Sequence, residues 1–132
     1  VDGVSEFEAA PGSAEKITTR YFGNEASGDL NGNERDDVAF LVTQDSGGSG
    51  IFYYAIVAMQ QEDGSYQTTN AFLIGDRIAP QSTIIDSTTG EIDVNYADRL
   101  PDEPMTAQPS QGVTLRLHVN TDGVLEKVGE SR

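Results

Sequence analysis

The sequence predicts an all-β protein, mainly an antiparallel meander of about seven or eight strands that forms a curled sheet, a barrel or a sandwich, with little helix. Three observations predict this class. Apolar and polar residues alternate with a period of two in the second half of the chain. Continuous apolar runs rich in β-branched and aromatic residues lie in the first half. Short segments containing glycine separate these runs, as is typical where antiparallel strands reverse direction.

The two most apolar segments are the first predicted strands. Pro11 and Gly12 interrupt the only early stretch with helical composition, so at most a short helical turn fits over residues 13–16. Residues 38–43 and 51–59 are continuous apolar runs, and we expect both to be central strands covered on both faces. We expect residues 44–50, which are rich in glycine and serine, to form a flexible connection between them.

The later strands are predicted from alternation. Residues 71–74 form a shorter apolar strand. Residues 91–96 and 113–119 each alternate apolar and polar side chains, which is typical of a strand with one buried face. Glycine tolerates the positive φ of tight turns, and three dipeptides mark such turns: Asp63-Gly64, Thr89-Gly90 and Asp122-Gly123.

Length and composition limit the classes of protein that this chain can belong to. The 132 residues predict a single β domain over residues 1–132. The chain has 22 acidic and 8 basic residues, and its net charge of −14 opposes binding to nucleic acid. With no cysteine, thiol catalysis and cysteine-ligated zinc are excluded. No apolar run approaches the roughly 20 residues of a membrane-spanning helix.

The segment from Gly28 to Asp37 carries the most specific chemical signal. Oxygen-bearing side chains occur at alternate positions, namely Asp29, Asn31 and Asn33, and return at Asp37. A hard cation such as Ca²⁺ binds six to eight oxygen atoms, and a short loop supplies them when every second side chain points inward. The backbone carbonyl of Arg35 would fill the gap. The predicted metal ligands of this calcium-type loop, residues 29–37, are Asp29, Asn31, Asn33, Arg35 and Asp37.

This loop resembles the calcium-binding loop of FG-GAP repeats, the blades of integrin-type β-propellers. The resemblance runs from Phe22-Gly23 through the loop to the apolar strand at residues 38–42, and it implies that the five residues named above hold calcium. The family commonly has aspartate where this chain has Asn33 and glycine where it has Glu34, which implies a left-handed backbone at Glu34. The Gly-Ala-Pro of the repeat is missing after Val42. The loop occurs once, whereas a propeller needs at least four blades, so we expect it within a different fold.

An Asx-rich turn that holds no metal has the same spacing, so this alternative remains open. The calcium-type loop is not an EF-hand, because the twelfth position counted from Asp29 is Phe40 rather than an acid.

The Pro-rich loop at residues 97–112 is longer than an ordinary connection. It contains Pro101, Pro104 and Pro109. Loops of this length in compact domains are functional, held in place by packing, or disordered. Asp93, Asp98, Asp102 and Glu103 lie in or near it and are the best acidic group outside the calcium-type loop.

The chain lacks the constellations of common enzymes. Its one histidine, His118, is expected on the polar face of a strand beside Arg116. Ile51 stands where a Gly-x-Ser-x-Gly hydrolase motif around Ser49 would need its last glycine. We assign no catalytic residue and expect a non-enzymatic domain. Asp76-Arg77 and Asp98-Arg99 are interpreted as turn-stabilising pairs.

The broader sequence, from Tyr21 to Met105, resembles a group of uncharacterised bacterial secreted or lipoprotein domains, through segments such as residues 75–80 and 96–99. The resemblance implies an extracytoplasmic location: periplasmic, lipid-anchored upstream of Val1, or secreted. We therefore expect an exported β domain with a structural Ca²⁺, acting as a binding or accessory module for a protein or glycan partner. The alternative is a small secreted hydrolase or hydrolase inhibitor that uses residues 97–112.

Overall fold

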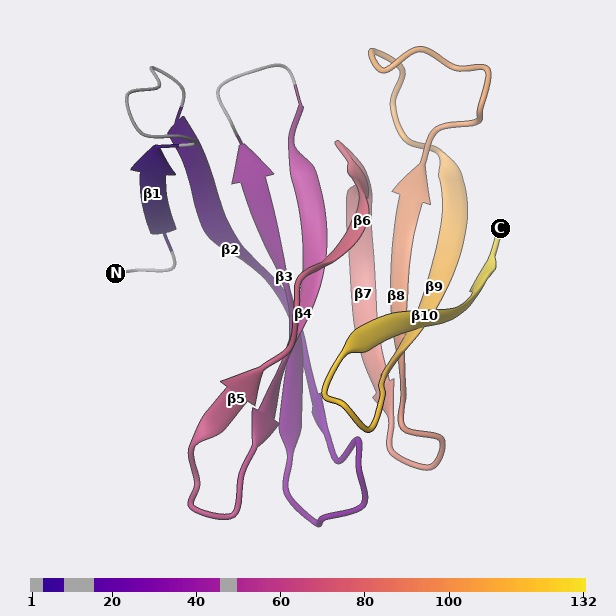
Figure 1. Cartoon of the computed structure of the whole chain (residues 1–132). Coiled ribbons are helices and arrows are strands. Elements are labelled where there is room, and N and C mark those ends of the chain that lie inside the picture. Colours follow the sequence, from indigo (N-terminus) through magenta and orange to yellow (C-terminus); the bar gives the residue numbers. More distant parts are fainter. Residues whose placement is uncertain (1–3, 9–15, 46–49) are drawn as a thin grey trace.

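The computed structural model of the chain describes residues 4–8, 16–45 and 50–132. Every regular element in these residues is a strand, and ten strands form two antiparallel sheets that pack face to face without closing into a barrel (Figure 1). The predicted all-β class is therefore confirmed, in its sandwich form. Within the described residues no helix is long and apolar enough to cross a membrane.

The larger sheet has six strands, and each of its first four strands pairs with the next along the chain. Its order is β1-β2-β3-β4-β5. β6 also pairs with β4: β5 pairs with residues 58–60 of that strand and β6 with residues 52–55. The strands are β1 (Val4–Glu8), β2 (Lys16–Gly28), β3 (Asp37–Asp45), β4 (Phe52–Gln60), β5 (Tyr66–Thr68) and β6 (Phe72–Asp76).

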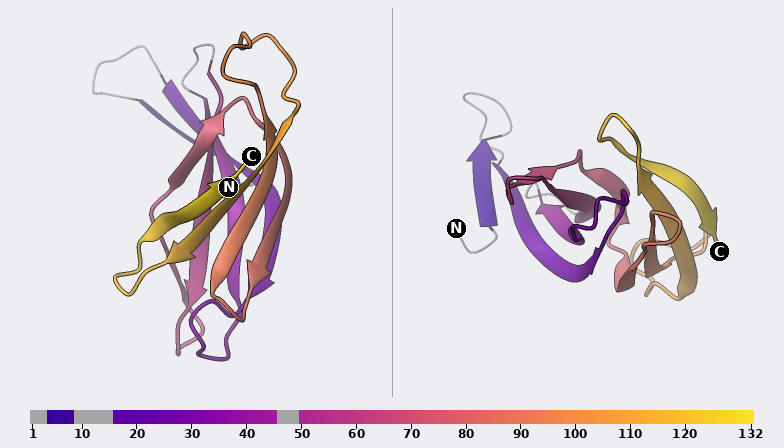
Figure 2. Two further views of the ribbon diagram at one scale, coloured as in Figure 1. Left: turned by 90° about the vertical axis from the view of Figure 1, so that its right-hand side faces the viewer. Right: turned by 90° about the horizontal axis from the view of Figure 1, so that it is seen from below.

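The smaller sheet has four strands in the order β10-β9-β8-β7. They are β7 (Ala79–Asp86), β8 (Glu91–Asp98), β9 (Gln111–Val119) and β10 (Leu125–Ser131). Successive strands are neighbours here as well, so the predicted meander is confirmed within each sheet. The chain passes from one sheet to the other between β6 and β7, and the two layers are seen separately from below in Figure 2.

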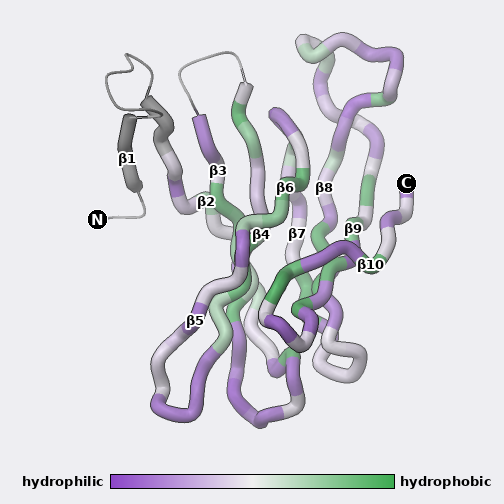
Figure 3. Tube along the Cα trace, viewed as in Figure 1, coloured by the Kyte–Doolittle hydropathy of each residue, from purple (hydrophilic) through white to green (hydrophobic). Residues whose placement is uncertain are grey.

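The core lies between the sheets and follows from the alternation of side chains along each strand. β3 and β4 contribute every second residue, as do β8 and β9 from the opposite sheet. The buried cluster consists of Ala39, Leu41, Ala55, Val57, Ile78, Ile92, Val94, Tyr96, Val113, Leu115, Leu117 and Leu125. Hydrophilic residues gather at the connections between strands, including the lower loops of Figure 3.

One edge of the sandwich is fastened by a side chain. The amide of Asn70, in the connection between β5 and β6, accepts a hydrogen bond from the N–H of Leu125 at 2.8 Å and donates one to its carbonyl at 3.2 Å. Asn70 thus makes the pair of bonds that a neighbouring strand would make, and it joins the six-stranded sheet to β10.

The predicted strands and turns agree with the structure. β3, β8 and β9 cover three of the predicted segments, and β4 and β6 cover the other two except for their first residues, Ile51 and Ala71. The turn glycines Gly64, Gly90 and Gly123 have φ of 86°, 73° and 78°. The predicted helical turn at residues 13–16 and the glycine-rich connection lie largely outside the described residues, although Lys16 opens β2.

Sequence patterning did not single out the other five strands, β1, β2, β5, β7 and β10. The reason is clear for the two longest of them, β2 and β7. β2 carries glycine and many polar residues, and its pairing with β3 shifts register twice, between Tyr21 and Gly23 and between Gly23 and Ala26. Such bulges break the period of two that reveals a strand. β7 contains Pro80, which is tolerated because β7 is the edge strand of its sheet.

Candidate metal centre and the adjoining cleft

The predicted calcium-type loop connects the end of β2 to the start of β3, at the lower end of the molecule in Figure 1. Gly28, the last residue of β2, packs against β7 so closely that an added Cβ would lie 2.6 Å from Cγ2 of Ile85. This contact with the opposite sheet fixes the point from which the loop begins.

The carboxylate of Asp29 organises the first half of the loop. Oδ1 accepts hydrogen bonds from the N–H groups of Gly32 at 2.9 Å, Asn31 at 3.2 Å and Asn33 at 3.3 Å, and Oδ2 accepts one from Glu34 at 2.8 Å. The Glu34 N–H, with smaller contributions from the other three, holds the pKa of Asp29 below its usual value, against the opposing effect of desolvation. The carboxylate is therefore anionic over the whole neutral range.

The two asparagines bend the chain by local hydrogen bonds. Oδ1 of Asn31 accepts the N–H of Asn33 at 3.3 Å, and Oδ1 of Asn33 accepts the N–H of Arg35 at 2.9 Å. These are successive Asx turns. Gly32 has a φ of 75° and Glu34 a φ of 63°, so both the predicted bend at the glycine and the left-handed backbone at Glu34 are confirmed.

Asp37 closes the loop from inside the protein. Its side chain is fully buried, with a relative exposure of 0%. Oδ1 accepts the N–H of Gln60 at 2.9 Å and Oδ2 accepts the N–H of Leu30 at 3.0 Å. Because Leu30 follows Asp29 directly, this bond brings the two acidic ends of the loop together. The bond to Gln60 ties them to the end of β4.

The structure therefore places the predicted side chains in one tight loop, and each of the four offers at least one oxygen atom. Each carbonyl or carboxylate oxygen has two lone pairs, so the single N–H bonds of Asn31, Asn33 and Asp37 leave each of these oxygens able to accept a second partner. Carboxylate, amide and backbone oxygens are the ligands that a hard cation prefers. The same N–H bonds satisfy the loop without a metal, as the Asx-turn alternative requires.

Sequence analysis missed the links that fix the loop in the fold. The bonds from Leu30 and Gln60 to Asp37 involve backbone amides, which carry no signature in the sequence. A hint was available in the position of Asp37, an acid that directly precedes an apolar strand.

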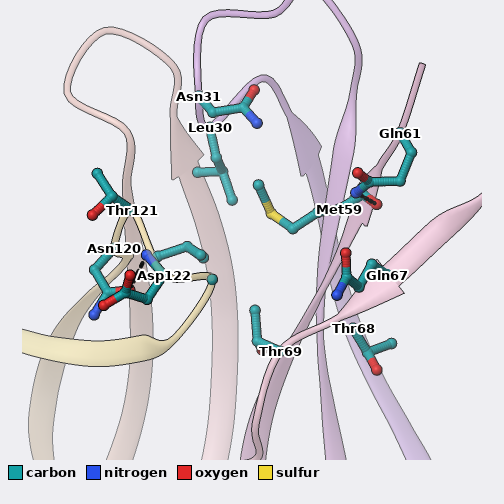
Figure 4. Close-up of a pocket in the computed structure, with 12 residues that line it drawn as sticks. Leu30, Asn31, Met59, Gln61, Gln67, Thr68, Thr69, Asn120, Thr121 and Asp122 are labelled. Atoms are coloured by element: carbon teal, nitrogen blue, oxygen red, sulfur yellow. Dashed lines mark hydrogen bonds between the residues drawn. The ribbon is translucent and has the colours of Figure 1, made fainter.

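A cleft adjoins the loop at the open end of the sandwich (Figure 4). It has a volume of about 410 Å³. Leu30 and Met59 reach into it from opposite sides and provide an apolar floor continuous with the core. Amide and hydroxyl groups dominate its walls, with Asp122 as the one charged side chain. The remaining lining residues are Asn31, Gln61, Gln67, Thr68, Thr69, Val119, Asn120, Thr121 and Gly123.

The long loop between β8 and β9 spans residues 99–110, somewhat less than the predicted 97–112, and hydrogen bonds hold it in place. The guanidinium of Arg99 donates to the carbonyl of Ala107 at 2.8 Å and to that of Arg77 at 2.9 Å. Arg99 is therefore not paired with Asp98 through its guanidinium; Asp98 instead accepts the Arg99 N–H at 2.7 Å. Asp76 and Arg77 do form the predicted ion pair, at 3.3 Å.

The other acidic candidates have separate roles. Glu103 accepts the N–H of Leu100 at 2.7 Å, and Asp98 lies 3.9 Å from the guanidinium of Arg132. His118 lies on the polar outer face of β9, with Nε2 2.6 Å from Glu126. Among the residues that the structure describes, no three His, Cys, Asp or Glu side chains gather as a metal-binding group. The candidate loop does not meet that description, because its four side chains are two acids and two amides.

No family model matches this chain, and no curated protein and no solved structure matches it significantly. The functional argument therefore depends on the geometry of the loop and the cleft.

Proposed function

We propose that the protein is an exported, non-enzymatic β domain in which the loop at residues 29–37 holds one structural Ca²⁺. The observation that carries this proposal is the arrangement of Asp29 and Asp37. Four backbone N–H groups hold the first carboxylate in place, and the second is fully buried beside the start of the loop. A buried carboxylate is costly unless it is well bonded or near a cation.

The ligands would be the side chains of Asp29, Asn31, Asn33 and Asp37 and the carbonyl of Arg35. Only two of them carry charge, so we expect an affinity in the micromolar to millimolar range of sensor and extracellular sites. When bound, the cation would offset the repulsion between the two carboxylates and secure the entry to β3.

The direct test is calorimetric titration of chelator-treated protein with CaCl₂, together with thermal unfolding. At about 100 times the dissociation constant, Ca²⁺ should stabilise the fold by roughly 2.7 kcal/mol. Asp29→Ala should abolish this gain, and Asn33→Asp should enlarge it by adding a charged ligand. Asp63→Ala is the matched control, because Asp63 also accepts a local N–H, that of Ser65 at 2.9 Å, but lies in another turn.

If both wild type and Asn33→Asp show no heat of binding and no thermal shift at about 10 mM CaCl₂, the loop is a metal-free Asx turn. That concentration is above the dissociation constants of even the weakest extracellular calcium sites.

We further propose that the domain serves as a binding or accessory module, with the cleft beside the loop as the place where a protein or glycan ligand binds. The cleft has the volume of an ordinary ligand pocket and combines an apolar floor with polar walls. A glycan array probed with wild type and Thr121→Trp, which enlarges one of the exposed residues that line the cleft, tests this. Thr88→Trp, in an exposed turn outside the cleft, is the control. Glycan binding unaffected by Thr121→Trp would contradict the assignment.

The alternative function, a hydrolase or hydrolase inhibitor using residues 97–112, gains no specific support. The Arg99 contacts give that loop a structural explanation, and we keep the binding module as the proposed function.

A further inference from the structure

The face of the six-stranded sheet that points away from the core has an unusual composition. Ala39, Leu41, Ala55 and Val57 point into the core, so the alternate residues of β3 and β4 form what we call the outer face. These nine residues are Val38, Phe40, Val42, Gln44, Phe52, Tyr54, Ile56, Ala58 and Gln60. None is charged, although the chain contains 22 acidic residues.

The register places apolar residues opposite one another across this face. Phe40 pairs with Ile56, and Val42 pairs with Tyr54. The patch continues onto the flanking strands, because Leu73 of β6 pairs with Tyr54 and the ring of Tyr21 lies 5.6 Å from that of Phe40. A second apolar cluster thus lies on the opposite side of the sheet from the core.

The four-stranded sheet shows what the outer surface of a solvated sheet looks like in this protein. Its outward residues on β8 and β9 include Glu91, Asp93, Arg116 and His118, and the pairs Asp93–Arg116 and Glu91–His118 lie directly across from one another. Antiparallel sheets with one wet face normally alternate in this way. β3 and β4 do not, which is why the sequence predicts strands covered on both faces.

The described residues form only two layers, and the four-stranded sheet covers only the inner face of β3 and β4 (Figure 2). The outer face is most open to solvent at its borders. Phe52 is 37% exposed, and the flanking Leu73 and Tyr21 are 51% and 43% exposed, whereas Val42, near the middle of the face, is buried. Contiguous apolar surface of this kind marks an interaction site.

We propose that the outer face is a self-association surface, and that its occupant is a second copy of this chain. The distribution of charge is the reason. Two molecules with a net charge of −14 repel each other, so they associate most readily through a surface with few carboxylates. The nine residues of the outer face carry none. Asp76, which pairs with Phe52 at the border of this face, is neutralised by its ion pair with Arg77. A two-fold contact also requires a patch that is complementary to itself, and an uncharged apolar sheet face meets this requirement. A basic partner would find no acid among the nine residues of the outer face.

The size of the surface predicts a weak dimer. Four strands at a spacing of about 4.8 Å, over about seven residues with a rise of about 3.4 Å each, cover roughly 450 Å² per chain. A total near 900 Å² is at the low end of protein interfaces, where association is transient. Because the two chains repel, added salt should tighten the dimer.

Sedimentation velocity tests the proposal, with chelator-treated protein so that it is independent of Ca²⁺ binding. Between about 10 and 500 µM, the range relevant to a weak interface, we expect wild type to shift from monomer towards dimer, more strongly in about 0.5 M NaCl than in about 0.05 M. Ile56→Asp and Leu73→Asp should remain monomeric. Leu73 lies on β6 rather than on a central strand, so this variant retains the test if Ile56→Asp impairs folding.

Ile84→Asp is the matched control. Ile84 is 52% exposed and pairs with Asp93 on the outward side of the other sheet, so this variant adds the same charge without touching the outer face and should dimerise as wild type does. A wild type that stays monomeric throughout, or a dimer that persists in both Ile56→Asp and Leu73→Asp, would overturn the proposal.

Discussion

Glu34 is the residue of the loop whose backbone least suits its side chain. Its φ of 63° is left-handed, which costs a non-glycine residue roughly 1–2 kcal/mol. Glycine removes this cost but gains entropy in the unfolded chain, so Glu34→Gly should stabilise the protein by about 0.5–1 kcal/mol. The measurement is urea denaturation without Ca²⁺. Glu62→Gly, at an exposed turn residue with negative φ, should destabilise it; a loss of stability in Glu34→Gly would show that the strain is not relieved.

Asp29 should make part of the stability depend on pH. Its pKa is lowered in the folded state, chiefly by the Glu34 N–H, so its stabilising contribution is present above the unfolded pKa of about 3.8 and is lost as the pH falls through the lower, folded pKa. In chelator, wild type should therefore lose more stability than Asp29→Ala between about pH 5 and pH 3. Equal losses in urea denaturation would mean that the N–H bonds to Asp29 contribute nothing.

At the scale of elements, the junction between Asn70 and β10 holds the two sheets together at one edge. Asn70→Ala leaves the N–H and carbonyl of Leu125, a residue only 1% exposed, without their partner. We expect a loss of about 1–3 kcal/mol in the free energy of unfolding. Thr68→Ala, at an exposed position of the adjacent β5, should change it by less than about 0.5 kcal/mol. Equal effects of the two substitutions would refute the bridging role.

The strands differ in how far the sequence reveals them, for reasons of pairing. β8 and β9 have one dry and one wet face, so alternation predicts them directly. β3 and β4 have two apolar faces, so the sequence indicates central strands but not the identity of either cover. β2 is hidden, because the register shifts near Gly23 move its side chains out of phase.

For the whole molecule, the net charge of −14 should make stability respond to ionic strength. Self-repulsion is weakened when NaCl rises from about 0.01 to 0.5 M, because the Debye length falls from about 30 Å to under 8 Å. The melting temperature should rise over this range, at protein concentrations too low for association. Sodium and calcium must be varied separately, since a specific site responds to Ca²⁺ at far lower concentrations. An unchanged melting temperature in NaCl would contradict the repulsion argument.

The candidate site shows the same division between local and distant information. The spacing of Asp29, Asn31, Asn33 and Asp37 predicts a tight oxygen-lined loop, because Asx turns and the bend at Gly32 depend on neighbours within a few residues. The burial of Asp37 and its bond to Gln60 could not be predicted, since the two residues are 23 positions apart in sequence.

The sequence by itself determined the all-β class, the tight turns, the central position of β3 and β4, and the Asx turns of the loop. All of these follow from periodicity and from interactions within a few residues. The tertiary structure alone decided that the strands form a two-layer sandwich, that Asn70 closes one edge, and that a cleft opens beside the loop. It also decided which apolar face of β3 and β4 meets the core and which meets solvent. Alternation fixes which side chains share a face, but pairing between distant strands decides what that face contacts.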